Sequence, residues 1–202
     1  GSAIATQFIE TGVYKKVLVV GAETLSKFVN WHDRNTCIIF ADGAGAAVYG
    51  EVEQGYGMLS FDLGADGSGA TTIEIPGGGS KHPADQESID NHMHCLHMNG
   101  KETFRFAVKA MGSTVMKSLE RAGLQKEDID YLIPHQANIR IIESAAKRLH
   151  LPMDKVFVNI EKYGNASAAS IPIAMAEAYQ SGKLKKGEII ALSGFGAGLT
   201  WA

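Results

Sequence analysis

The sequence predicts an α/β protein in which strands and helices alternate. Short apolar runs that end in turn residues alternate with longer stretches whose apolar positions repeat at helical spacing. Two polar motifs, PHQAN at 134–138 and YGNASAAS at 163–170, each follow an apolar run and precede a small-residue helix start. Because strand ends of open α/β sheets face the ligand crevice, we expect His135 and Asn165 to be site residues. Taken singly, each also fits an ordinary role in a helix cap or a left-handed turn.

The N-terminal part of the chain predicts one helix followed by three strands. Gly12 is placed to terminate the helix, and the apolar sequence KKVLVVGAE after it is typical of a buried strand. The sequence ADGAG predicts a turn between the second and third strands. The predicted bounds are 2–11 for the helix and 15–23, 37–41 and 46–51 for the strands.

The middle of the chain predicts one strand and a long irregular segment. The break QGYG precedes a strand at 57–63. Residues 64–100 are rich in Gly, His and Asn, which is typical of a long functional loop.

The last hundred residues return to alternating helices and strands. Apolar positions from Phe104 to Leu119 repeat at helical spacing, and Gly123 is placed to end that helix. Pro172 stands close enough to the start of the last helix to be tolerated there. The predicted helices are 101–122, 138–151 and 165–182, and the predicted strands are 130–134, 187–195 and 198–202.

Composition excludes several classes of protein. With 45% apolar and 20% charged residues, the chain has the balance of a globular domain with a substantial core. No apolar run reaches the roughly 18 residues of a membrane span. Two cysteines without paired spacing predict neither a disulfide framework nor a zinc knuckle, and favour a reducing cytoplasm. A net charge of -3 argues against nucleic-acid binding as the main role.

Seven motifs in order resemble β-ketoacyl-acyl-carrier-protein synthase III, the initiating condensing enzyme of type II fatty-acid synthesis. The resemblance covers essentially all 202 residues. It implies a thiolase-like fold (layered αβαβα), with 1–54 as the remainder of the N-terminal half and 55–202 as the C-terminal half. Besides PHQAN and YGNASAAS, the motifs are NWHDRNTCIIFADGAGAAV at 30–48, LGADGSG at 63–69, PGGGSKHP at 76–83, MNGKETFRFAV at 98–108 and SGFGAGLTW at 193–201.

The resemblance implies decarboxylative condensation of an acyl-CoA starter with malonyl-acyl carrier protein. His135 and Asn165 would both donate hydrogen bonds to the enolate that forms when carbon dioxide leaves. The start of a helix at His135 would help to keep its imidazole neutral. In the loop GFGAGLTW, the backbone N–H of Ala197 would serve the oxyanion of the acyl-cysteine adduct. No cofactor is implied, because coenzyme A and phosphopantetheine thioesters are substrates.

Five basic residues are candidates for binding coenzyme A and the acidic carrier protein. Arg34, beside Trp31, matches the position that meets the adenine and phosphate of coenzyme A, where a guanidinium suits stacking and phosphate binding. Three further residues occupy offsets 0, 7 and 8 of one predicted helix and hence one face, for which an ordinary solvated basic face is the alternative. These are Arg140, Lys147 and Arg148, and the family alignment adds Arg105.

The acyl-carrying cysteine of the family would lie about six residues before Gly1, so we expect the isolated chain to be inactive. Cys37, in the apolar run CIIF, is predicted to be buried and inert, and Cys95 has no helix start beside it to lower its pKa. Strand alternation would send His92 and His94 to one face and Cys95 and His97 to the other, so no metal site is predicted.

Two other functions stay open at this point. A related starter synthase of a polyketide or quinolone pathway would share the same motifs. The isolated chain could also be a binding and dimerisation module without turnover, since a homodimer is implied for the whole enzyme. The starter acyl group cannot be read from these residues.

Overall fold

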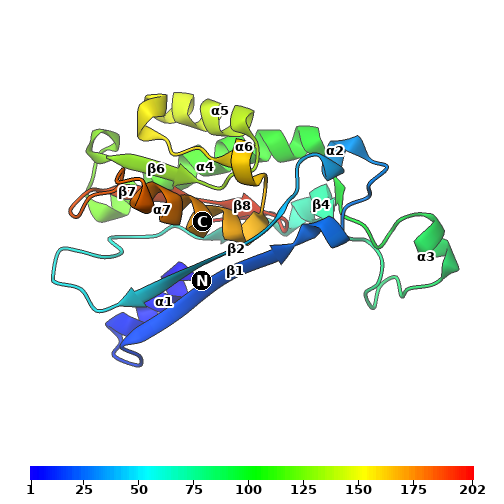
Figure 1. Ribbon diagram of the computed structural model, residues 1–202, viewed down its shortest axis with the longest axis horizontal. Helices are drawn as coiled ribbons and strands as arrows, with labels where there is room; N and C mark the ends of the chain where they lie inside the picture. Colours follow the sequence, from blue (N-terminus) through cyan, green and yellow to red (C-terminus); the bar gives the residue numbers. More distant parts are fainter.

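The computed structural model describes all 202 residues and confirms an α/β protein (Figure 1). None of its helices is both long enough and apolar enough to cross a bilayer. The helices are α1 (Ser2–Glu10), α2 (Arg34–Cys37), α3 (Gln86–Asp90), α4 (Gly100–Ala122), α5 (Ile139–Leu149), α6 (Ile160–Tyr163) and α7 (Ser170–Gln180). The strands are β1 (Lys16–Thr24), β2 (Asp42–Gly50), β3 (Gly64–Ala65), β4 (Ile73–Glu74), β5 (His97–Met98), β6 (Tyr131–Pro134), β7 (Ile190–Ser193), β8 (Phe195–Gly196) and β9 (Thr200–Trp201).

The main elements stack in layers, which Figure 1 shows nearly edge-on. The antiparallel pair β1–β2 is followed by α7, then by the parallel pair β6–β7, and then by α4 and α5. Within β6, Leu132 packs toward α4 and α5, whereas Ile133 packs with α7. The pair β6–β7 is therefore covered on both faces, which explains why its strands are continuous apolar runs.

Residues 42–45 of the ADGAG sequence lie inside β2, so the predicted turn is wrong. Gly21 of β1 and Gly45 of β2 are paired across the ladder. A Cβ atom at Gly21 would come within 2.6 Å of the carbonyl oxygen of Ala168, and one at Gly45 within 2.9 Å of the amide nitrogen of Ile173. These glycines permit the close approach of α7 and of the short helix η5 (Ser167–Ala169) to the sheet.

The strand predicted at 37–41 does not form. Cys37 is instead the last residue of α2, a helix that the carboxylate of Asp33 caps by accepting a hydrogen bond from the Asn35 amide at 3.0 Å. Only Phe40 keeps a strand-like contact, an isolated bridge to Asn165.

The strand predicted at 57–63 is also wrong, although its residues precede β3 directly. Side chains tie this segment to α4 in place of a neighbouring strand. Asp62 is buried and pairs with Arg121, with Oδ1 and Nη2 2.9 Å apart. Ser60 donates a hydrogen bond to the carbonyl oxygen of Ser118. Apolar and polar residues alternate here without a ladder, so the pattern alone was misleading.

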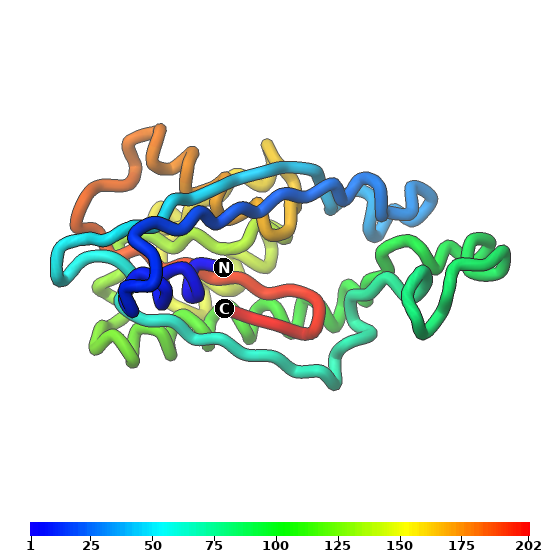
Figure 2. Tube along the Cα trace, turned by 90° about the horizontal axis from the view of Figure 1, so that it is seen from below, coloured from blue at the N-terminus to red at the C-terminus, as the bar shows by residue number.

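Residues 64–100 combine irregular backbone with short elements. The pair β4–β5 joins the two ends of a segment that includes α3 and projects from the layered body (Figures 1 and 2). The predicted long loop is therefore confirmed in its general character, with short helices and strands inside it.

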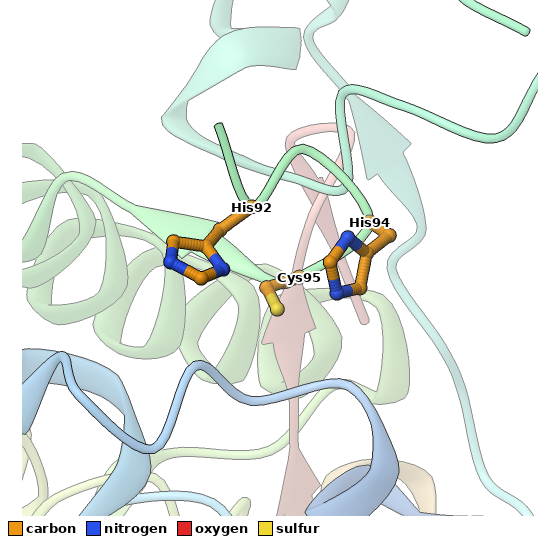
Figure 3. A group of neighbouring side chains, drawn as sticks. All are labelled: His92, His94 and Cys95. Carbon is orange, nitrogen blue, oxygen red and sulfur yellow. The ribbon is translucent and has the colours of Figure 1, made fainter. Parts of the chain in front are cut away.

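The alternation expected at 92–97 is wrong, because residues 91–95 form a turn and β5 begins only at His97. The Cys95 amide donates to the carbonyl oxygen of His92 at 3.0 Å, which closes the turn. His92, His94 and Cys95 consequently lie together and do not point to opposite faces (Figure 3).

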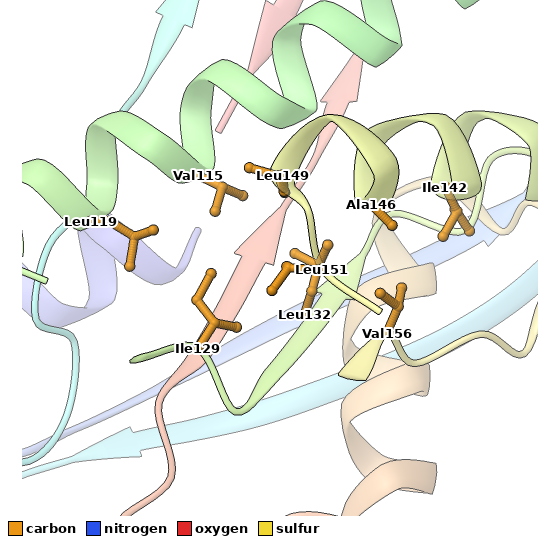
Figure 4. Packing of buried hydrophobic residues seen from close by; sticks show 9 residues of the cluster. All are labelled: Val115, Leu119, Ile129, Leu132, Ile142, Ala146, Leu149, Leu151 and Val156. Carbon is orange, nitrogen blue, oxygen red and sulfur yellow. The ribbon is translucent and has the colours of Figure 1, made fainter. Parts of the chain in front are cut away.

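The predictions for the helix at 101–122, the strand at 130–134 and the helix at 138–151 are confirmed as α4, β6 and α5. Asn99 caps the start of α4, and Gly123 ends it with a left-handed φ of 69°. Fully burying each large aliphatic side chain between these elements stabilises the fold by about 1.5 to 3 kcal/mol. The cluster, drawn in Figure 4, consists of Val115, Leu119, Ile129, Leu132, Ile142, Ala146, Leu149, Leu151 and Val156.

Candidate active site

One pocket brings together four of the residues predicted from the sequence. His135, Asn165, Arg34 and Ala197 line a single cavity of about 750 Å³. The cavity opens between α2, the start of α4, the segment before α5 and the end of β8. Other residues that line it include Leu96, Met98, Phe104, Asn138 and Phe195.

His135 directly follows β6, as predicted, and its backbone extends the pairing with β7. Its amide donates to the carbonyl oxygen of Ser193 at 2.7 Å. The imidazole is 8% exposed, packs edge-on against Phe195, and has Nδ1 at 2.6 Å from the Ser170 hydroxyl oxygen. That oxygen also accepts a hydrogen bond from the Gln136 amide. The pattern favours a serine hydroxyl that donates to Nδ1, which leaves the hydrogen on Nε2 for a ligand.

Burial keeps the His135 imidazole neutral. It lowers the pKa of His135 from 6.5 to about 4, because removing the ring from water disfavours the cation. The cause differs from the predicted one, since α5 begins only at Ile139. A neutral imidazole with a fixed tautomer can donate one hydrogen bond without carrying charge.

We expect this imidazole to stay uncharged from about pH 8 down to about pH 5. In an NMR titration, the ring signals that vanish in a His135→Gln variant should keep constant chemical shifts over that range, because the pKa of His135 is lowered to about 4. A titration midpoint close to the ordinary histidine pKa of 6.5 would show that the ring is not desolvated as described.

Asn165 follows α6 and not a strand, so the predicted strand-to-helix turn is correct for His135 alone. Its backbone is held by Ile39, whose carbonyl oxygen accepts from the Asn165 amide at 3.0 Å, and by Ala41, whose amide donates to the Asn165 carbonyl oxygen at 2.9 Å. Its side-chain Oδ1 accepts from the Ser167 amide at 3.0 Å. With Oδ1 occupied in this way, the carboxamide NH₂ is the donor that remains for a ligand.

Sequence reasoning missed two polar residues that position His135. Ser170 fixes the ring through Nδ1, as described above. The buried Gln136 side chain donates to the carbonyl oxygens of Pro134 and Phe157, at 2.9 and 3.1 Å, and accepts from the Asn159 amide at 3.0 Å. These contacts connect the end of β6 to the segment 157–159. The only signal in the sequence is that both lie in the PHQAN and YGNASAAS motifs.

Arg34 and Ala197 lie at different parts of the pocket wall. Arg34 is exposed at the start of α2, and its neighbour Trp31 is 66% exposed. Ala197 follows β8, and its carbonyl oxygen accepts from the Thr200 hydroxyl at 3.0 Å. An exposed guanidinium and aromatic ring beside a cavity suit a phosphate-bearing ligand with a planar base.

The remaining predicted basic residues do not line this pocket. Arg105 lies in a separate surface depression and pairs with Glu102, with Nη1 and Oε1 3.4 Å apart. Arg140 is exposed two residues after Asn138, which does line the pocket. Arg148 lies against Gly112, roughly two turns or about 12 Å further along α4 than the pocket-lining Phe104. Arg140 therefore lies close to the pocket, whereas Arg148 lies further from it.

Neither cysteine lines the pocket. Cys37 ends α2 and is partly exposed, so the prediction of a fully buried thiol is wrong. Cys95 is buried, and this burial raises the pKa of its thiol. That neither residue carries an acyl group stays a prediction, which the position of both outside the pocket supports.

The chain matches two models of one protein family. Residues 119–202 match the model described as 3-oxoacyl-[acyl-carrier-protein (ACP)] synthase III C terminal, and residues 1–67 match the model described as 3-oxoacyl-[acyl-carrier-protein (ACP)] synthase III. Over its full length, the chain is 60% identical to a beta-ketoacyl-[acyl-carrier-protein] synthase III of Caldanaerobacter subterraneus. It is 56% identical, again over its full length, to the protein of that name from Clostridioides difficile. The chain spans 61% of the length of each of these two relatives.

Solved structures give the same result. The synthase III of Thermus thermophilus is 46% identical with a TM-score of 0.89, over 98% of this chain and 61% of that one. The enzyme of Pseudomonas aeruginosa is 37% identical with a TM-score of 0.89, over 100% and 60%. A priming beta-ketosynthase of the R1128 polyketide pathway is 32% identical with a TM-score of 0.84, over 98% and 59%. These similarities confirm the predicted thiolase-like α/β fold.

Proposed function

Because the chain belongs to the 3-oxoacyl-[acyl-carrier-protein] synthase III family, we propose that it is part of an enzyme that condenses an acyl-CoA starter with malonyl-acyl carrier protein. Acetyl-CoA is such a starter. The reaction is a decarboxylative Claisen condensation that starts fatty-acid elongation. The observation that carries the proposal is the meeting of His135 and Asn165 in one pocket, each with its other polar atom already bonded.

Both side chains are suited to stabilise an enolate. When the malonyl carboxylate leaves as carbon dioxide, the electron pair of the broken C–C bond moves onto the thioester carbonyl oxygen. The Nε2–H of His135 and the NH₂ of Asn165 would donate to that oxygen. Both donors are largely shielded from water, at 8% and 6% exposure, so they need little reorganisation as the charge develops. The enolate carbon would then attack the enzyme-bound acyl thioester.

We propose that the acyl group is carried by a residue other than Cys37 and Cys95, because neither lines the pocket. Its oxyanion would be stabilised by the Ala197 N–H, for which the position of Ala197 on the pocket wall is the support. Thioesters of coenzyme A and phosphopantetheine are the substrates, and no further cofactor is needed. We propose that residues 1–54 complete the N-terminal half of the fold and that residues 55–202 form the C-terminal half.

Incubation of this chain with radiolabelled acetyl-CoA is expected to leave both cysteines unlabelled. Cys37 and Cys95 lie outside the pocket, and the pKa of the Cys95 thiol is raised by burial, so little thiolate is present to attack. Mass spectrometry of cysteine peptides, with hydroxylamine treatment to detect thioesters, measures this. Stoichiometric, hydroxylamine-sensitive label on either residue would contradict the assignment.

The carrier protein would dock its acidic surface beside the pocket mouth, where Arg34 and Arg140 lie. Arg105, Lys147 and Arg148 are proposed to extend this surface. Rim charges of this kind mainly set the association rate and its salt dependence. None of Arg34, Arg140, Lys147 and Arg148 is engaged in an ion pair within the chain.

Charge reversal at Arg140 is expected to reduce use of the carrier-linked substrate by about tenfold at low salt, and by less as salt screens the interaction. Decarboxylation of malonyl-CoA should change little, because that substrate brings no protein surface. Arg148→Glu is the matched comparison and should have a smaller effect, since Arg148 lies further from the pocket on the same helix. Equal effects of the two changes, or salt slopes that stay the same, would favour an ordinary solvated face.

One alternative is tested by the substrates used. A starter synthase of a polyketide or quinolone pathway would have the same pocket, and the similarity to a polyketide priming enzyme is lower, at 32% against 60%. A strong preference for a carrier protein of such a pathway over the fatty-acid carrier would favour it. A non-catalytic binding and dimerisation fragment is the third possibility, for the isolated chain.

We place the whole enzyme in the cytoplasm as a homodimer. Two free thiols support the cytoplasm, since an oxidising compartment favours disulfides. Exposed apolar side chains on the outer face of β1–β2, including Leu18 at 63%, Val20 at 57% and Val48 at 69%, support burial of that face against further protein.

A further inference from the structure

A cluster of metal-binding side chains lies in the turn before β5, outside the proposed active site. His92, His94 and Cys95 each place a ligand atom within 4.8 Å of the other two. Figure 3 shows the Cys95 sulfur between the two imidazole rings. Both histidines are exposed and Cys95 is buried, so an ion could reach the cluster from solvent and bind the thiolate at its inner side.

The backbone of this turn is held by hydrogen bonds to two other parts of the chain. The carbonyl oxygen of Met93 accepts from the Gly77 amide at 2.7 Å, and the Leu96 amide donates to the carbonyl oxygen of Phe28 at 2.7 Å. His92 itself has a left-handed φ of 53°, a conformation that few residues other than glycine adopt. The three side chains therefore project from a fixed backbone, which reduces the ordering that metal binding would require.

The donor set identifies the class of metal. Imidazole nitrogen and thiolate sulfur are the ligands of Zn²⁺, and soft thiolate ligands disfavour Mg²⁺ and Ca²⁺. Around a tetrahedral Zn²⁺ the donor atoms lie about 3.3 to 3.6 Å apart, so the present donors, which lie within 4.8 Å of one another, need to close by at most about 1.5 Å. Rotation of the two exposed histidine side chains can provide this movement.

We propose that His92, His94 and Cys95 form a three-ligand Zn²⁺ site with an open fourth position. That position can be filled by water or by His32, whose ring centroid lies 6.4 Å from that of His92. Cys95 immediately precedes Leu96, which lines the pocket with His135 and Asn165. A bound ion would therefore fix the projecting segment at the point where it meets the pocket wall.

Co²⁺ and Zn²⁺ titrations of the protein test the site, and neither depends on condensing activity. Co²⁺ should produce a thiolate-to-metal charge-transfer band in the near ultraviolet that saturates at one ion per chain and is lost on addition of Zn²⁺. His94→Ala should weaken Zn²⁺ binding at least about tenfold, measured by competition with a chromophoric chelator. Cys95→Ser should abolish the band.

Two control variants keep the test specific. Cys37→Ser retains Cys95 and should keep the band unchanged, and His82→Ala removes an exposed histidine of the same projecting segment without touching the cluster. Circular dichroism should show that every variant is folded. The proposal is overturned if the folded wild-type protein gives no charge-transfer band, or if His94→Ala and Cys95→Ser bind Zn²⁺ as well as the two controls do.

Discussion

Replacing His135 by alanine in the enzyme that contains this chain is expected to slow decarboxylation of malonyl-acyl carrier protein by about 10² to 10³. The change removes a buried, neutral donor that Ser170 holds in place at 2.6 Å. Asn165→Ala should have an effect of similar size. Release of radiolabelled carbon dioxide measures the rate, and His82→Ala is the matched control, since His82 is exposed and lies outside the pocket.

The double variant gives a further check on a shared role. If both donors serve one oxygen, removing the second after the first should cost less than removing it alone, because residues that act as a unit have non-additive effects. Decarboxylation that stays within a few-fold of the control in both single variants would mean that other groups stabilise the enolate.

Gly21→Ala is expected to lower the free energy of unfolding by about 1 to 3 kcal/mol. The new Cβ atom would lie 2.6 Å from the carbonyl oxygen of Ala168, so either β1 or η5 must move. Because η5 starts at Ser167, whose amide holds the Asn165 side chain, the movement should also reduce decarboxylation. Urea unfolding of the whole enzyme measures the stability change.

Gly79→Ala is the matched control for Gly21→Ala. A Cβ atom at Gly79 would meet nothing within 4 Å, and its backbone lies outside the left-handed region. The same substitution should therefore leave the unfolding midpoint nearly unchanged there. Equal stability of the two variants would show that the contact between β1 and η5 is not close enough to require glycine.

The long helices could be predicted from sequence because local signals agree with the tertiary contacts. In α4, the helical repeat, the Asn99 cap and the Gly123 terminus all indicate the same element. For the glycines of β2, in contrast, the local signal disagrees with the tertiary contacts. ADGAG has the composition of a turn, yet Gly43 and Gly45 lie in a strand because α7 packs against them. That requirement comes from residues more than a hundred positions away, which local pattern cannot reveal.

The site was predicted in part for a similar reason. His135 and Asn165 stand out in their motifs, and both line the pocket. The roles of Ser170 and Gln136 depend on which atoms meet after folding, so they could not be predicted from the spacing of residues in the sequence. At 92–97 the sequence suggests strand alternation, but a turn closed by the hydrogen bond from the Cys95 amide to the His92 carbonyl oxygen brings His92, His94 and Cys95 together. Short polar segments of this kind carry little periodicity from which to predict side-chain direction.

His135 and Asn165 are proposed to serve the enolate and not the acyl-carrying residue. The most direct test measures both half-reactions, acyl transfer from acyl-CoA and decarboxylation of the malonyl thioester, in one preparation each of the His135→Ala and Asn165→Ala enzymes. Decarboxylation should fall by about 10² to 10³ while acyl transfer stays within a few-fold of the unmodified enzyme. An equally steep loss of acyl transfer in variants that remain folded would contradict the claim.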